Sequence, residues 1–286
     1  MKFFAKKSSA FVALLLVAAM IFAAGCGAKE TPEETTSTTT AQAETLPAQE
    51  TEISAPDESV AVSESEAASE EASVETSEET TEAALPQTVP EIVELFNKTA
   101  NRIKPEATKI TKNFERRIAD TDKLVVPKSL ESTAESLLNT FMKDDTDPIV
   151  YATRDEINAE YLVPGQSYVS KLTADAVRSA TCTDKGDTYE INIKLRDEKN
   201  PTAGKGIGSV CDVIEASEVA EKASFVEEFS TEYYGCEVTV TVDKASGRVI
   251  HAVYKTPLVL KVVVNMFGTH NGEVGLTFIK DYTINY

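Results

Sequence analysis

Apolar and polar residues alternate through most of the last fifty positions, and this pattern constrains the fold more than any other feature of the chain. A period of two residues is typical of a β-strand that buries one face. Asp243–Gly247 interrupts the pattern with residues that favour a tight turn, and Gly247 can adopt a positive φ there. We therefore predict a β-hairpin whose inward residues are Cys236, Val238, Val240 and Val242 on the first strand and Ile250, Ala252 and Tyr254 on the second.

The alternation continues to the end of the chain. Pro257 has no N–H group to donate to a ladder, so we expect it at a bulge or at an edge of the sheet. Leu258–Val264 is almost wholly apolar, which indicates a strand buried on both faces. Asn271-Gly272 is a typical two-residue hairpin turn. The strand after it is expected to bury Val274, Leu276, Phe278, Tyr282, Ile284 and Tyr286.

Helical periodicity dominates the segment that starts at Pro90. Apolar residues recur every three to four positions from Ile92 to Ile103, which predicts a helix that Pro105 ends or kinks. Ala107–Arg116 fits either a helix or a strand, and its threonines favour a strand. Ser129 is a candidate N-cap for a second helix that buries Leu130, Ala134, Leu137, Leu138 and Phe141. Further on, we expect a short helix at 173–177, a hairpin of 180–183 with 189–196, and a Gly-rich loop with short helices at 201–222.

These elements predict one α+β domain over residues 89–286, in which helices pack on one face of a twisted antiparallel sheet. A segment of this length can bury a substantial core. From Pro90 to Tyr286 it contains thirty-one acidic and twenty-four basic residues, a net charge of −7. Nucleic acids and anionic membrane surfaces both require a basic footprint, so neither is an expected partner.

Residues 26–88 have a different composition, and we expect them to form a disordered linker. No aromatic residue occurs between Phe22 and Phe96, and Gly27–Val89 holds sixteen acidic residues against one basic residue. Such a segment cannot bury enough apolar surface to offset its conformational entropy. A neutral flexible linker of this length would span roughly 45 Å, and charge repulsion extends it further. The simplest interpretation is a solvated spacer, and the alternative is capture of a cation or a partner by the acidic run.

Residues 1–25 resemble a bacterial lipoprotein signal peptide. Three lysines precede the apolar run Ala10–Ala24, which is too short to span a bilayer. The run ends in Ala23-Ala24-Gly25-Cys26, similar to the lipobox of bacterial lipoproteins, although Ala23 stands where that family usually has leucine. The resemblance implies cleavage before Cys26, diacylglycerol on its thiol and a location on the outer face of the bacterial cytoplasmic membrane. Two acyl chains suffice for stable anchoring.

No catalytic or metal motif stands out in the rest of the chain, and no cofactor is expected. We favour buried, unpaired thiols at Cys182, Cys211 and Cys236, with a Cys182–Cys236 disulfide as the alternative outside the cell. His251 should point away from the apolar face of its strand, and His270 should lie in a turn. The run 204–209 lacks the ending of a phosphate-binding loop, so we interpret it as a flexible connection. The neighbours Glu227 and Glu228 face opposite ways on a strand and cannot easily share a site.

The order of elements and the Asp-x-x-x-Gly hairpin of the region 90–286 resemble a group of lipoproteins of Gram-positive gut anaerobes that has no assigned activity. They also resemble, more loosely, the half-barrel of lipoprotein carriers, where a curved sheet and helices enclose an apolar cavity. The latter resemblance implies a binding module of the cell envelope for an apolar ligand or lipid, and the apolar density of Leu258–Phe267 agrees with it. The alternative is a structural or partner-docking protein with no small ligand. We do not expect an enzyme, because no acid/base pair presents itself.

Overall fold

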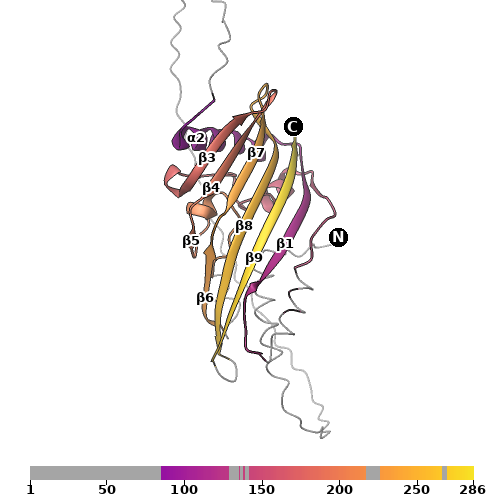
Figure 1. Ribbon diagram of the computed structural model, residues 1–286. Coiled ribbons are helices and arrows are strands. Elements are labelled where there is room, and N and C mark those ends of the chain that lie inside the picture. The colour runs from indigo at the N-terminus through magenta and orange to yellow at the C-terminus, as the bar shows by residue number, and fades with distance from the viewer. Residues whose placement is uncertain (1–84, 129–134, 136–137, 139–141, 217–225, 266–268) are drawn as a thin grey trace, which may run out of the picture. The chain divides into compact units, whose positions relative to one another are not determined.

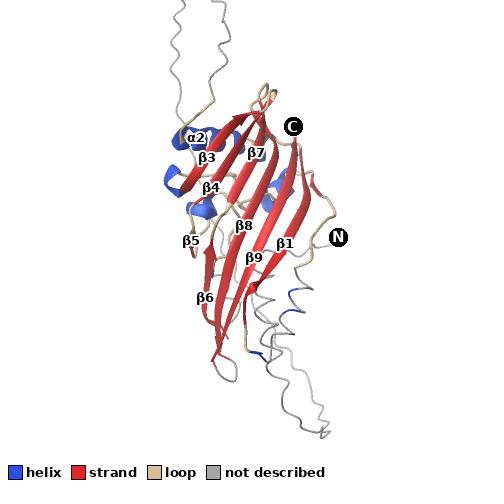
Figure 2. Ribbon diagram, viewed as in Figure 1, coloured by secondary structure: helices blue, strands red, loops and turns tan. Residues whose placement is uncertain are grey.

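The computed structural model describes residues 85–128, 135, 138, 142–216, 226–265 and 269–286 (Figure 1). The predicted signal peptide, Cys26 and most of the predicted linker lie outside these residues. Within them, nine strands form one sheet in which every pairing is antiparallel (Figure 2). The strands are β1 Lys109–Val125, β2 Ile149–Tyr151, β3 Val177–Asp184, β4 Thr188–Leu195, β5 Glu198–Lys199, β6 Val226–Tyr233, β7 Glu237–Asp243, β8 Arg248–Asn265 and β9 Thr269–Asn285.

The long strands β8 and β9 form the middle of the sheet (Figure 1). β9 pairs with β1 on its other side, and β1 pairs with the short edge strand β2. β8 changes partner along its length. Its first part pairs with β7, which leads on to β4 and β3, and its second part pairs with β6, which leads on to β5. The sheet therefore branches at β8.

Pro257 lies at this branch point in the interior of the sheet, and not at the bulge or outer edge predicted from the sequence. Pairing with β7 ends at Lys255, and pairing with β6 begins at Leu258. The carbonyl oxygen of Pro257 accepts a hydrogen bond from the N–H of Tyr234 at 3.2 Å. The N and C=O of one strand residue point to the same side. The N–H that proline lacks would therefore point into the gap between β7 and β6, where no ladder partner is needed.

The predicted turn at Asn271-Gly272 is wrong, because both residues lie within β9. Asn271 pairs with Val263 and Gly272 pairs with Val262, and the ladder extends to the pair Asn265–Thr269. The connection between β8 and β9 thus falls on residues 266–268, which lie outside the described part of the chain. A continuous ladder of two long strands outweighs the local turn preference of one Asn-Gly dipeptide.

The β7–β8 hairpin is confirmed, but Ile250 does not face inward as predicted. A bulge separates the pairs Val242–Val249 and Thr241–His251, and Ile250 is the extra residue. Val249 is buried in its place, while Ile250 remains 36 % exposed. The hairpin between β3 and β4 and the strand at 107–116, now part of β1, are also confirmed.

The fold is richer in β-structure than the predicted α+β arrangement. The longest described helix is α2 (Val89–Ala100), and α3 (Ile103–Glu106) and α5 (Arg154–Glu160) are short. The predicted helix at 173–177 is a single 3₁₀ turn, η3 (Ala174–Ala176), and a second turn, η4 (Gly206–Ser209), lies in the Gly-rich loop. Pro105 lies inside α3 and does not end α2. Most of the helix predicted after Ser129 lies outside the described residues.

One face of the sheet, here called the inner face, carries the hydrophobic core. Alternate residues of the central strands point into it and are almost fully buried, among them Ile191, Ile193, Val238, Val240, Ala252, Tyr254, Leu258, Leu276 and Tyr282. The apolar side of α2 joins the same core through Ile92, Phe96 and Ala100. Val259 is buried on the opposite face, in partial agreement with the expectation for Leu258–Val264.

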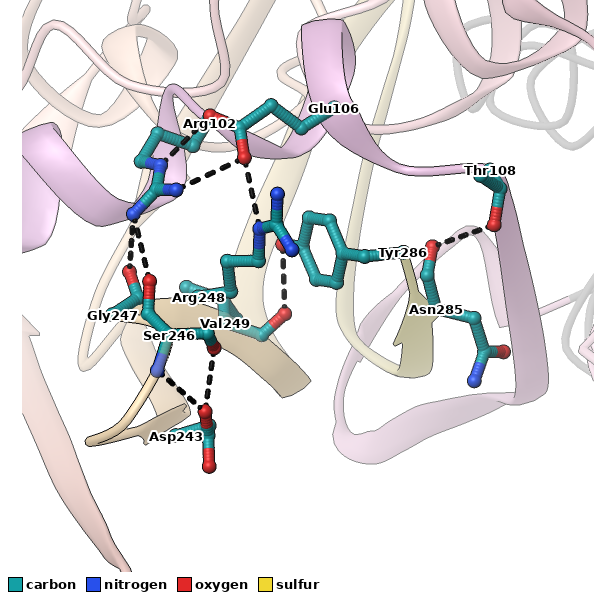
Figure 3. Close-up of polar contacts among 10 residues, drawn as sticks. All are labelled: Arg102, Glu106, Thr108, Asp243, Ser246, Gly247, Arg248, Val249, Asn285 and Tyr286. Atoms are coloured by element: carbon teal, nitrogen blue, oxygen red, sulfur yellow. Dashed lines mark hydrogen bonds and ion pairs between the residues drawn. The ribbon is translucent and has the colours of Figure 1, made fainter.

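A polar cluster fixes the end of the sheet near the β7–β8 turn to the helical segment (Figure 3). Glu106 accepts hydrogen bonds from the guanidinium groups of Arg102 and Arg248, at 2.8–3.0 Å. Tyr286 lies under the Arg248 guanidinium and donates its hydroxyl hydrogen to the carbonyl of Val249 at 2.9 Å. The side chain of Tyr286 thus belongs to the folded structure, as the alternation predicts.

Candidate functional site

Six charged side chains cluster on the inner face, next to the hydrophobic core. Glu115 of β1 is the centre of this charged cluster. Lys112 Nζ lies 2.9 Å from Glu115 Oε2, and Arg117 Nε lies 3.0 Å from Glu115 Oε1. The other three members are Asp145, Lys280 and Asp212, at longer distances. Asp145 Oδ2 lies 3.6 Å from Lys112 Nζ. Lys280 Nζ lies 3.6 Å from Asp212 Oδ2.

Strand pairing brings these charges together. Glu115 is directly opposite Lys280 of β9, and Lys280 is opposite Tyr254 of β8, so all three point to the inner face. Lys112 reaches Glu115 across the bulge that follows it on β1. The cluster contains three cations and three anions, so it is electrically balanced. Such a cluster is stable only while its members are paired, since removing one partner leaves an uncompensated buried charge.

The pKa values reflect this balance. Burial alone would raise the pKa of Glu115, but the positive charges of Lys280, Lys112 and Arg117 outweigh it and lower the pKa to about 2. Burial alone would lower the pKa of Lys280, and the carboxylates of Asp212 and Glu115 outweigh that effect and raise it. Both groups are therefore charged at neutral pH. Perturbed carboxyl and amine groups of this kind mark a candidate site, although structural ion pairs show them too.

A small cavity adjoins Lys280. It is lined by Asp212, Ile214, Tyr233, Thr256, Leu258, Phe278 and Lys280, and it leaves about 10 Å³ for the centre of a water molecule. That volume admits one water at most. The neighbouring aromatic side chains pack tightly, with the rings of Tyr161 and Tyr282 5.0 Å apart at a right-angled contact. This part of the inner face therefore offers no room for an organic ligand.

A larger hollow of about 680 Å³ lies along the edge of β1 that faces away from β9, and we call it the edge groove. Its lining residues are Arg117, Ile118, Ala119, Thr121, Glu135, Leu138, Met142, Lys143 and Asp144. The buried side chains of Leu138 and Met142 form an apolar floor together with Ala119, and charged side chains form the rim. Ligand pockets in proteins usually have volumes of about 300–1,000 Å³. The edge groove is thus of ligand size, and Arg117 connects it to the charged cluster.

The strand edge that borders the groove is only partly paired. β2 covers Ile110–Lys112, and Glu115 exchanges two backbone hydrogen bonds of 2.8 Å with Asp145. Asp144 Oδ1 then accepts from the N–H of Arg117 at 3.0 Å. Backbone groups of alternate strand residues point to the same side. The N–H and C=O of Ala119 therefore point into the groove, and no described residue forms a hydrogen bond with them there.

Exposed apolar side chains gather near the same edge. The large hydrophobic residues most exposed among the described ones are Ile118, Val125, Ile149, Val150 and Ile250. Four of these five lie on β1 and β2, and Ile118 and Val150 are each about half exposed. A concentration of exposed apolar groups on an edge strand is typical of an interaction site.

The cysteines singled out in the sequence do not form a site. All three thiols of the described chain are free, and Cys211 and Cys236 are buried as predicted, whereas Cys182 is only partly buried, contrary to the prediction. Cys182 is opposite Ile191, which is opposite Val240, four residues beyond Cys236. The Cα atoms of Cys182 and Cys236 are therefore two strands apart across the sheet and four residues apart along it, which is a separation of about 16 Å. A disulfide needs Cα atoms about 4.4–6.8 Å apart, so the alternative Cys182–Cys236 bridge does not fit the register.

The histidines lie away from the groove. His251 points to the outer face as expected, and its Nε2 is 3.1 Å from both carboxylate oxygens of Asp281. No cysteine or serine nucleophile is described beside this pair. His270 is paired with Val264 within β9 and does not lie in a turn, because the predicted turn there is itself absent.

The Gly-rich loop is held in place by acidic side chains rather than being a flexible connection. Glu198 Oε2 accepts from the N–H of Ile207 at 2.8 Å, and Glu215 Oε1 accepts from the N–H of Ala203 at 2.7 Å. An added Cβ on Gly206 would lie 2.2 Å from the Glu198 carboxylate. These two backbone N–H groups are therefore already engaged by carboxylates. Glu227 and Glu228 lie on β6 and neither joins the groove.

The charged cluster is not among the sites predicted from the sequence, although one signal was present. Lys280 falls on the inward positions of the series Val274, Leu276, Phe278, Tyr282, where a charged residue requires a partner. Its partners on β1 lie more than 160 positions earlier in the chain, and local patterns do not reveal such a pairing.

The described residues contain no cluster of three or more histidine, cysteine, aspartate or glutamate residues suited to a metal ion. None of their helices has the length and apolar character needed to cross a membrane. Comparison of the chain with models of protein families, with curated proteins and with solved structures found no match.

Proposed function

We propose that this protein is a binding module of the bacterial cell envelope, held outside the cytoplasmic membrane by lipid on Cys26, and that its ligand binds in the edge groove. The signal peptide, the lipobox resemblance and the acidic linker support the location. The observation that carries the binding function is the groove itself, a hollow of about 680 Å³ with an apolar floor beside a partly unpaired strand.

The proposal keeps the finer arrangement expected from the sequence, with helices covering the inner face. Ile92 of α2, Ile103 of α3 and Ile157 of α5 all belong to the same buried cluster as the inward residues of the sheet. A sheet filled in this way has its binding surface at an edge. An enclosed lipid cavity, as in the carrier half-barrel, has less support, because the enclosed cavity beside Lys280 holds one water at most.

An apolar small molecule or lipid is one candidate ligand, and the buried Leu138 and Met142 on the groove floor favour it. A docked protein is the other candidate. The exposed Ile118, Ile149 and Val150 favour a docked protein, because they extend the apolar surface beyond the groove.

A photo-crosslinking amino acid at Ile118 tests the site in living cells. Ile250 is the matched control, because it is also an exposed isoleucine of the sheet but does not line the groove. We expect a specific adduct from position 118 and none from position 250. A mass increase of a few hundred daltons identifies a lipid or small ligand, and a large shift identifies a protein. Equal or absent labelling at the two positions contradicts the proposal.

The anchor is tested separately. The full chain should partition into the detergent phase, and Cys26→Ser should move it to the aqueous phase, because the thiol that carries the acyl chains is gone. Retention of residues 1–25 in the isolated protein would contradict the lipoprotein assignment.

A further inference from the structure

We propose that the edge groove binds an extended polypeptide segment of a partner protein, which adds to the sheet as a strand beside β1. This inference rests on the proposed function, since it identifies the ligand class of the same groove. Addition of a strand to an open sheet edge is a recurrent mode of peptide recognition, in which main-chain hydrogen bonds supply affinity and alternate side chains supply specificity.

The backbone of β1 offers the hydrogen bonds for such a strand. Asp145 already exchanges two backbone bonds with Glu115, and the Asp144 side chain accepts from the N–H of Arg117. The next groups along the edge without a hydrogen-bond partner among the described residues are the C=O of Arg117 and the N–H and C=O of Ala119. A peptide in line with Asp145 can satisfy these groups without moving β1. Acyl chains of lipids and apolar small molecules have no groups that could hydrogen-bond with them in series, and this distinction favours a polypeptide.

The side chains around the edge fit the two faces of an added strand. Residues of the peptide that point inward would contact Leu138 and Met142, which are buried under the groove. Residues that point outward would lie next to Ile118, which is 49 % exposed. Successive strand residues point to opposite faces, so a peptide with apolar residues at alternate positions covers the floor.

The charges near the groove favour a basic peptide. Among the described residues that line the groove, Glu135 and Asp144 are exposed carboxylates and Lys143 is an exposed cation. Arg117 does not change this balance, because its guanidinium is engaged by Glu115. The region from residue 90 onward is itself acidic, with a net charge of −7. A lysine or arginine at each end of the bound segment would complement this surface.

The test uses a seven-residue probe peptide with lysine at both ends, valine at alternate positions and threonine between them. Hydrogen exchange of the full chain is measured with and without the probe. We expect exchange of the Ala119 amide to slow about tenfold at saturating probe, since this N–H gains a partner. Amides of the β7–β8 hairpin, far from the groove, should exchange at unchanged rates. Unchanged exchange at Ala119 with saturating probe overturns the inference.

N-methylation of the probe gives an independent test that leaves the protein unaltered. A strand presents its N–H groups alternately to its two sides, so one set of methyl groups faces β1 and the other faces solvent. Each methyl group on the side facing β1 should weaken binding about threefold to tenfold, because it removes one hydrogen bond. Methyl groups on the other side should leave affinity unchanged. Equal losses on both sides overturn strand addition.

The variant Ala119→Pro removes the free N–H of the edge. Its backbone nitrogen is not needed by β9, so the fold should persist, as checked by circular dichroism and the thermal midpoint. We expect lost probe binding with an unchanged spectrum. The crosslinking test distinguishes failure of the peptide ligand from failure of the groove as a binding site. A lipid-mass adduct at Ile118 without probe binding would retain the groove as the binding site and reject the polypeptide as its ligand. The absence of any adduct at Ile118 would reject both.

Discussion

Glu115→Gln is the substitution that most directly tests the charged cluster. Glutamine keeps the shape of the side chain and removes the negative charge at its centre. Lys112, Arg117 and Lys280 then share two remaining carboxylates, Asp145 and Asp212, each 3.6 Å from its nearest lysine. The change thus leaves positive charge buried without compensation, which is strongly destabilising in proteins.

The pKa of Glu115 gives the size of the stability loss expected for this substitution. It falls from an ordinary value of 4.5 to about 2 in the folded protein. At 1.36 kcal/mol per pKa unit, the ionised carboxylate contributes about 3 kcal/mol to the free energy of unfolding at pH 7. A group whose pKa is lowered by folding stabilises the protein above its unfolded pKa, and this stabilisation is lost as the pH falls. Only about 1 kcal/mol of it should remain at pH 3.

Urea unfolding at pH 7, 4 and 3, followed by far-ultraviolet circular dichroism, measures this dependence. Glu94→Gln is the matched control, because Glu94 is an exposed carboxylate on α2. We expect Glu115→Gln to lose about 3 kcal/mol at pH 7 and progressively less at lower pH, and the control to lose little at any pH. A constant loss from pH 7 to pH 3 would show that Glu115 acts through packing and not through its charge. No loss at pH 7 would refute the argument altogether.

Four further predictions follow from single sites. Burial lowers the pKa of Lys104 to about 8, below its unfolded value, so wild-type stability should rise by about 1 kcal/mol from pH 7 to pH 9, and Lys104→Met should not show this rise. Gly275→Ala should cost about 1–3 kcal/mol in urea unfolding, because the added Cβ would lie 2.8 Å from a neighbouring side-chain carbon. Tyr286→Phe should lower stability by about 1 kcal/mol through loss of its hydrogen bond. A thiol reagent should label Cys182 in the native protein and the two buried cysteines only in urea, and native labelling of all three would contradict the structure.

The hairpins that could be predicted from sequence are the ones specified by local chemistry. The alternation around Val238 and Val240, with a turn that contains Gly247, is sufficient to define β7 and the start of β8. The β3–β4 hairpin is equally local. In both cases the pattern, the turn residues and the short connection favour one structure.

The failures occur where a distant strand decides the outcome. Ile250 is displaced by a bulge that the facing strand imposes, and Pro257 is tolerated because β8 changes partner at that point. Asn271-Gly272 is drawn into β9 by a ladder with β8 that outweighs its turn preference. The local preference of each of these residues favours a different structure, and long-range strand pairing overrides that preference.

The edge groove could not be predicted for the same reason. It exists because β1 pairs with β9, from the opposite end of the domain, while β2 covers only a short part of the other side of β1. Nothing in the sequence around Ala119 indicates that its outward backbone groups have no partner among the described residues. Lys280 gave a usable signal only because it interrupts an apolar series.

The charged cluster and the groove meet at Arg117, and this connects the two main experiments. Its side chain is held by Glu115, and its backbone C=O belongs to the free edge that we propose for peptide binding. A strand edge is a good template only if its backbone groups are fixed in register before the peptide arrives. If the cluster provides that rigidity, Glu115→Gln should weaken probe binding even at urea concentrations where the variant is fully folded. If it serves stability alone, the folded variant should bind the probe as tightly as the wild type does.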